Sequence, residues 1–138
     1  MKKSIIFFFL LFNLVNAQTS KEKAFIGKWE VIEVPNLQAI NNPKVMETFS
    51  AFKGAQIEFN SNTNFSITFN KSNDFVTQIK QMTRGTKWSY NLKNDEIMVG
   101  SKENNYSILG FQFFTQNKEY YLKLFETEII LKIKRSKS

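Results

Sequence analysis

Gly27-Lys28-Trp29 opens the first predicted strand of this chain, and Arg135 lies near the end of the last one. Between these two points, most of the sequence alternates apolar with polar residues, which is typical of β-strands that bury one face. The first and last strands of a closed antiparallel barrel pair with each other. Strand parity turns Arg135 to the inner face, so we expect it to reach Trp29 and stack its guanidinium on the indole.

The alternating segments are short and numerous. They cover residues 55–60, 65–69, 86–92, 97–99, 106–114, 120–124 and 129–133, and Phe75–Met82 is a weaker candidate strand. The stretches between them, such as Ser61-Asn62-Thr63-Asn64, are rich in residues that favour turns. This pattern predicts an all-β fold, an up-and-down antiparallel β-barrel of about eight to nine strands, with a sandwich as the alternative.

A short helix is expected between the first and second strands. Asn42 suits an N-cap, Pro43 suits the first turn and Gly54 suits the exit, so the helix is predicted to span Pro43–Lys53. Its apolar side chains fall at helical spacing on one side: Val45, Met46, Phe49 and Phe52.

Residues 1–17 have the features of an export signal. Lys2 and Lys3 form a positive start, Ile5–Leu14 is an apolar stretch, and Val15-Asn16-Ala17 offers small residues for cleavage. The apolar stretch is shorter than the roughly 20 residues that span a bilayer, so an uncleaved anchor is the less favoured alternative. The sequence therefore predicts an exported protein, periplasmic or secreted, without a membrane span in the mature chain.

Residues 18–138 are long enough for one domain with its own core. Without Lys2 and Lys3 the formal net charge falls from +7 to +5, and the chain has no cysteine to form a disulfide. The lysines are spread singly among apolar residues, as on the solvated face of a sheet. A nucleic-acid footprint would require a clustered basic patch, so no nucleic-acid partner is predicted. Weak attraction to an anionic surface polymer stays open.

The composition argues against catalysis. With no histidine and no cysteine, the chain has no Ser-His-Asp triad, no thiol nucleophile and no histidine-based metal site. Its few glycines are scattered and form no phosphate-binding loop. We therefore predict a protein that is not an enzyme, with no cofactor and no metal.

Glu33 is the one acidic residue whose orientation the alternation leaves ambiguous. It shares strand parity with Trp29 and Val31, which are expected to point inward. Either the strand bulges near Val31, or Glu33 points inward as a polar contact for a ligand. The bulge is favoured, because burying an unpaired carboxylate is unfavourable by several kcal/mol.

Gly27-x-Trp29 with a basic residue crossing the indole resembles the lipocalin family and its small bacterial lipocalin-like relatives. The stretch Gly85-Thr86-Lys87-Trp88 at the start of a later strand is similar to theirs as well. The resemblance implies a ligand-binding barrel whose floor holds Gly27, Trp29 and Arg135. It also implies that the Val45–Phe52 helix closes one end as a lid, with a core-packing helix as the alternative.

The first functional hypothesis is a barrel that binds a small, mostly apolar molecule in its interior. The expected ligand contacts are Phe59, Ile67, Phe69, Trp88, Tyr90, Tyr106 and Glu33. Several polar residues on inward parity favour a space that is not packed solid: Thr77, Gln81, Thr86 and Gln112. The many aromatic residues would equally fill a small barrel completely.

The second hypothesis is a packed barrel that acts as an interaction module. Its outer face would bind a protein or an anionic surface polymer. The candidate contact patch consists of apolar residues on outward parity: Met98, Tyr121, Phe125 and Ile130.

Overall fold

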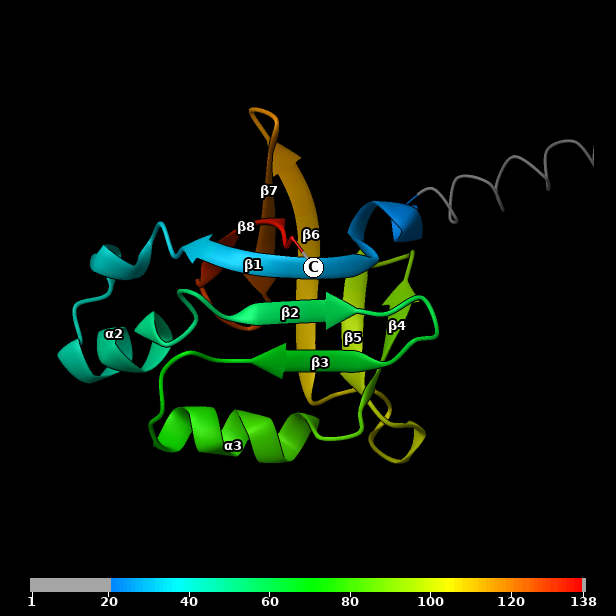
Figure 1. Cartoon of the computed structure of the whole chain (residues 1–138), viewed down its shortest axis with the longest axis horizontal. Coiled ribbons are helices and arrows are strands. Elements are labelled where there is room, and N and C mark those ends of the chain that lie inside the picture. The colour runs from blue at the N-terminus through cyan, green and yellow to red at the C-terminus, as the bar shows by residue number, and fades with distance from the viewer. Residues whose placement is uncertain (1–20, 138) are drawn as a thin grey trace, which may run out of the picture.

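A computed structural model describes residues 21–137, so the predicted export signal lies outside the described residues. Eight antiparallel strands wrap into a nearly closed up-and-down barrel in the order β3-β2-β1-β8-β7-β6-β5-β4 (Figure 1). The strands are β1 (Gly27–Glu33), β2 (Gln56–Phe59), β3 (Phe65–Thr68), β4 (Lys87–Asn91), β5 (Glu96–Gly100), β6 (Leu109–Gln116), β7 (Glu119–Leu124) and β8 (Ile130–Arg135). Two α-helices follow the first and third strands: α2 (Pro43–Ser50) and α3 (Asp74–Thr83). Two short 3₁₀-helices are η1 (Leu37–Ala39) and η2 (Lys102–Asn104). The predicted fold class is confirmed.

The barrel is closed least tightly between β3 and β4. One isolated bridge joins Asn64, just before β3, to Lys87 at the start of β4. Beside it, the amide of Trp88 donates to the carbonyl of Thr63 at 2.8 Å, and its indole Nε1 donates to the carbonyl of Asn60 at 2.8 Å. The Trp88 side chain therefore fastens a seam that has little strand pairing of its own.

The helix predicted between the first two strands is present as α2. The Asn42 side chain caps it by accepting the amide of Lys44 at 3.0 Å, and Pro43 occupies the first turn. The helix ends at Ser50 rather than at the predicted Lys53. Residues 51–54 form a turn in which Gly54 has φ +87°, a left-handed conformation that favours glycine.

The predicted strand Phe75–Met82 is wrong, because this segment forms the helix α3. Its apolar residues, at positions 75, 76, 79 and 82, fall at helical spacing, and the flanking Asn73 favours the helix by accepting the amide of Val76 at 2.8 Å. The side chains that the helix buries fall at helical spacing: Val76, Ile79 and Thr83. In Figure 1, α3 lies alongside β3 and carries the chain across to β4.

The polar residues expected inside the barrel do not line an internal space. Thr77 and Gln81 lie on the exposed face of α3. Gln112 lies between the inward-facing Phe111 and Phe113, so its side chain is on the outer face of β6. Thr86 is buried, but its hydroxyl donates to a backbone carbonyl at 2.7 Å. These residues therefore give no support to a hollow interior.

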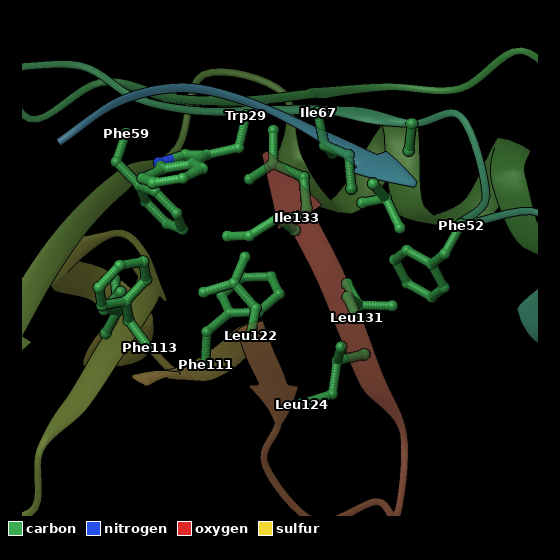
Figure 2. Close-up of a cluster of buried hydrophobic side chains, with 14 of the residues drawn as sticks. Trp29, Phe52, Phe59, Ile67, Phe111, Phe113, Leu122, Leu124, Leu131 and Ile133 are labelled. Carbon is green, nitrogen blue, oxygen red and sulfur yellow. The ribbon is translucent and has the colours of Figure 1, made fainter. Parts of the chain in front are cut away.

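Apolar side chains from all eight strands fill the centre of the barrel. Figure 2 shows Trp29, Phe59, Phe111 and Leu122 converging from four different strands. Other side chains that are almost completely buried are Val31, Ile57, Ile97, Leu131 and Ile133. The barrel is thus a packed core along most of its axis, as an eight-stranded barrel of this size permits.

The first and last strands pair as predicted, with Trp29 directly opposite Arg135. The register shifts between Val31 and Glu33, which is the expected bulge. Because of this extra residue, Glu33 turns to solvent and is exposed. Glu33 is therefore not a polar contact inside the barrel.

Candidate functional site

One end of the barrel, here called the floor, is closed by the segment that precedes β1. Residues 21–25 form a helical turn, and the Phe25 side chain is 0% exposed. Its ring contacts Phe59 and Trp88 edge-on, with centroid distances of 5.6 and 5.2 Å. The indole Nε1 of Trp29 donates to the carbonyl of Phe25 at 2.8 Å. This segment plugs the barrel below the predicted floor residues.

Arg135 holds the plug in place. Its guanidinium carbon lies 4.1 Å from the ring centroid of Trp29, as predicted from strand parity. The same guanidinium donates to the carbonyl of Ala24 at 2.9 Å and to the carbonyl of Ile26. A side chain at Gly27 would overlap the Arg135 guanidinium, which explains the glycine of the Gly-x-Trp stretch. The floor is therefore a structural closure.

Tyr90 belongs to the floor as well. Its hydroxyl donates to Oδ1 of Asp95 at 2.6 Å, and Nζ of Lys21 lies 3.5 Å from the same oxygen. Burial, and secondarily the Asp95 carboxylate, raise the pKa of Tyr90 well above its ordinary value. The phenol is engaged in this network and does not line the cavity described next.

At the other end of β6 and β7 lies a cavity of about 380 Å³, here called the mouth cavity. Four side chains of α2, its following turn and α3 form one wall: Phe49, Phe52, Phe75 and Ile79. The rim consists of residues 106–110, before and at the start of β6, and residues 124–127, at the end of β7 and in the turn to β8. The outer end is formed by Glu96 and Met98 of β5. Most of this lining is apolar.

The aromatic wall ties the two helices together. Phe75 of α3 lies 5.7 Å from both Phe49 and Phe52, measured between ring centroids. Phe52, which is 1% exposed, also contacts the half-buried Phe69 at 5.6 Å. Two of the four predicted lid residues, Phe49 and Phe52, thus line the mouth cavity. Val45 and Met46 are half-buried and do not line it.

The structure separates the predicted ligand contacts. Phe59, Ile67 and Trp88 are buried in the packed core and do not line the mouth cavity. Tyr106 does line it, although it lies in no strand: β6 begins only at Leu109, and Tyr106 has φ +54°. The prediction of a strand from Tyr106 onward is therefore wrong, because consecutive left-handed residues end regular pairing there.

Several lining residues were not predicted as ligand contacts. Phe75 and Ile79 were missed because their segment was read as a strand, although their spacing also fits a helix. Met98 and Phe125 were expected on the outer face, which is where their parity places them. They reach the mouth cavity because it extends around the rim of the barrel.

The outer end of the mouth cavity depends on Gly110. A Cβ at this position would lie 2.6 Å from Oε1 of Glu96 and 3.4 Å from the Phe125 side chain. The missing side chain lets the Glu96 carboxylate and the Phe125 ring lie over the backbone of β6. The cavity thus has an aromatic inner end and an outer end that carries a carboxylate.

Comparisons with protein-family models, with curated proteins and with solved structures found no match for this chain. Within residues 21–137, no helix is long and apolar enough to cross a membrane. In the same part of the chain, no group of three or more acidic side chains is placed to hold a metal ion. The site is therefore defined by its geometry alone.

Proposed function

We propose that this protein is an exported, lipocalin-like binding protein that holds a small, mostly apolar molecule in the mouth cavity without covalent chemistry. The observation that carries the proposal is the cavity itself, about 380 Å³ with aromatic and aliphatic walls. Ligand pockets in proteins span roughly 300–1,000 Å³, so a small ligand fits. The proposal moves the ligand from the packed interior to the end of the barrel.

The expected affinity is modest. A ligand that buries about 300 Å² of apolar surface gains about 7 kcal/mol at ~25 cal/mol per Å². Loss of translational and rotational freedom offsets part of this gain. Dissociation constants in the high micromolar range or weaker are therefore expected for a purely apolar probe. Tighter binding requires a polar contact in addition.

A cavity-filling variant tests the proposal. Ser107 is exposed and lines the mouth cavity, so Ser107→Phe adds an apolar ring there without disturbing the core. Ser72→Phe adds the same ring at an exposed loop position that does not line the cavity. Binding of N-phenyl-1-naphthylamine, followed by its fluorescence, is expected to fall in Ser107→Phe and to persist in Ser72→Phe. Equal binding by both variants, or none by the wild type, would refute the proposal.

The interaction module has one observation in its favour. On the outer face of β6 and β7, Phe114 and Tyr121 stack with centroids 5.2 Å apart and ring planes 14° apart. A paired aromatic surface of this kind is common at protein contacts. Co-elution of the protein with a soluble anionic glycan, lost in Tyr121→Ala but kept in Ser107→Phe, would favour this second function over the first.

A further inference from the structure

The charges around the mouth cavity have a single sign. The whole chain is basic, with 19 lysines and arginines against 12 acidic residues. Yet among the described residues that line the cavity, the two charged ones are Glu96 and Glu126. The lining of the cavity is therefore acidic, whereas the chain as a whole is basic. The charge of the lining indicates which charge a ligand should carry.

Glu96 is the better placed of the two carboxylates. It is half-buried on the outer face of β5, over Gly110 and beside Phe125. Among residues 21–137, no lysine or arginine forms an ion pair with its carboxylate, whose oxygens stay in contact with water. A carboxylate next to apolar side chains and without an ion-pair partner leaves room for a cation beside it. A donor or a cation delivered by the ligand would compensate it.

Glu126 is the second carboxylate in the lining of the mouth cavity. It follows Phe125 in the turn between β7 and β8, where it is exposed and has φ +65°. Lys123 does not line the mouth cavity but borders a neighbouring hollow together with Glu126 and Glu128. Acidic residues thus outnumber the basic residue there as well. The acidic side chains at this part of the rim are complementary to a positive group on a ligand.

The two sides of the cavity therefore differ in chemistry. Aromatic rings of α2 and α3 form one side of the lining, and Glu96 of β5 and Glu126 of the β7–β8 turn belong to the other. We propose that the occupant is a cationic amphiphile, whose apolar chain lies against Phe49 and Phe75 and whose ammonium group lies at Glu96. This inference rests on the proposed function and adds the charge of the ligand's head group. It excludes fatty-acid anions as preferred ligands, because their carboxylates would face Glu96.

Three probes with the same ten-carbon chain and different head groups show how much the head group contributes to binding: decylammonium, decanol and decanoate. Each is titrated against bound N-phenyl-1-naphthylamine at about 0.15 M salt, where a Debye length of about 8 Å screens the net charge of the protein. Decylammonium is expected to displace the dye at the lowest concentration and decanoate at the highest. Equal displacement by all three, or displacement by decanoate first, would overturn the inference.

The variant Glu96→Gln keeps the shape of the side chain and removes its charge. It is expected to weaken decylammonium binding about five-fold, the size of a partly exposed ion pair, and to leave decanol unchanged. Glu103→Gln changes the net charge equally at an exposed position that does not line the cavity, and it should weaken neither probe. Unchanged decylammonium binding in Glu96→Gln, with decanol still bound, would overturn the cationic head group and leave the proposed function intact. Failure of every probe to bind would overturn both.

Discussion

Replacing Phe25 with alanine tests whether the segment before β1 is an integral part of the barrel. The ring is 0% exposed and lies among four other aromatic rings: Phe59, Trp88, Tyr90 and Phe113, at centroid distances of 5.6, 5.2, 5.5 and 6.3 Å. Removing a phenylalanine from such a site costs about 3–5 kcal/mol, because the cavity left behind does not collapse completely. For a domain of this size, that loss corresponds to a fall in Tm of about 10–20 °C.

The measurement is urea unfolding followed by tryptophan fluorescence, since the Phe25 ring touches Trp88 directly. Lys23→Ala is the control: Lys23 lies on the same helical turn but is exposed, so its loss is expected to stay within about 0.5 kcal/mol. A loss below about 1 kcal/mol for Phe25→Ala would mean that residues 21–26 are a peripheral extension. The helical turn would then not be an integral part of the barrel floor.

Three further predictions concern single contacts. Arg135→Ala is expected to lower the free energy of unfolding by about 1–2 kcal/mol in urea titrations, because it removes the guanidinium from the Trp29 ring and from two backbone carbonyls. An unchanged urea midpoint would contradict this. Asn73→Ala removes the N-cap of α3 and is expected to cost about 1 kcal/mol, measured by thermal unfolding with circular dichroism; no change would mean that packing alone holds the helix. Lys132, whose Nζ lies 3.1 Å from Glu119, lowers the pKa of that carboxyl. The stabilisation from this ion pair is therefore present above the unfolded-state pKa of Glu119 and is lost as the pH falls through its folded-state pKa. Urea titrations at a series of pH values should show that acid destabilises the wild type more than Glu119→Gln.

The strands could be predicted because one face of each is buried, and burial leaves its period in the sequence. The pairing of Trp29 with Arg135 followed from parity and from closure of the sheet. Residues 75–82 were misread because Phe75 and Ile79 share strand parity, although the polar Thr77 and Gln81 interrupt the alternation. The helix of this segment is favoured by the side chain of Asn73, a local hydrogen bond that alternation does not register.

The candidate site was harder to predict than the fold. Parity separates inner from outer side chains, but it does not say how far along the barrel axis a residue lies. Phe59 and Trp88 were therefore expected beside a ligand and are instead part of the solid core. Phe125 was assigned to the outer face and Glu96 was not singled out, and their meeting over Gly110 at the rim depends on tertiary structure.

The pairing of β1 with β8 also has a consequence for how the barrel forms. Every other strand pair joins neighbours in the sequence, whereas Ile26 and Arg135, which meet beside this pair, are 109 residues apart. Bringing such distant segments together costs about 2–3 kcal/mol more chain entropy than closing a short hairpin. We therefore expect the β1–β8 ladder to form after the rate-limiting barrier to folding. Substitutions at Arg135 should then accelerate unfolding and leave the refolding rate nearly unchanged.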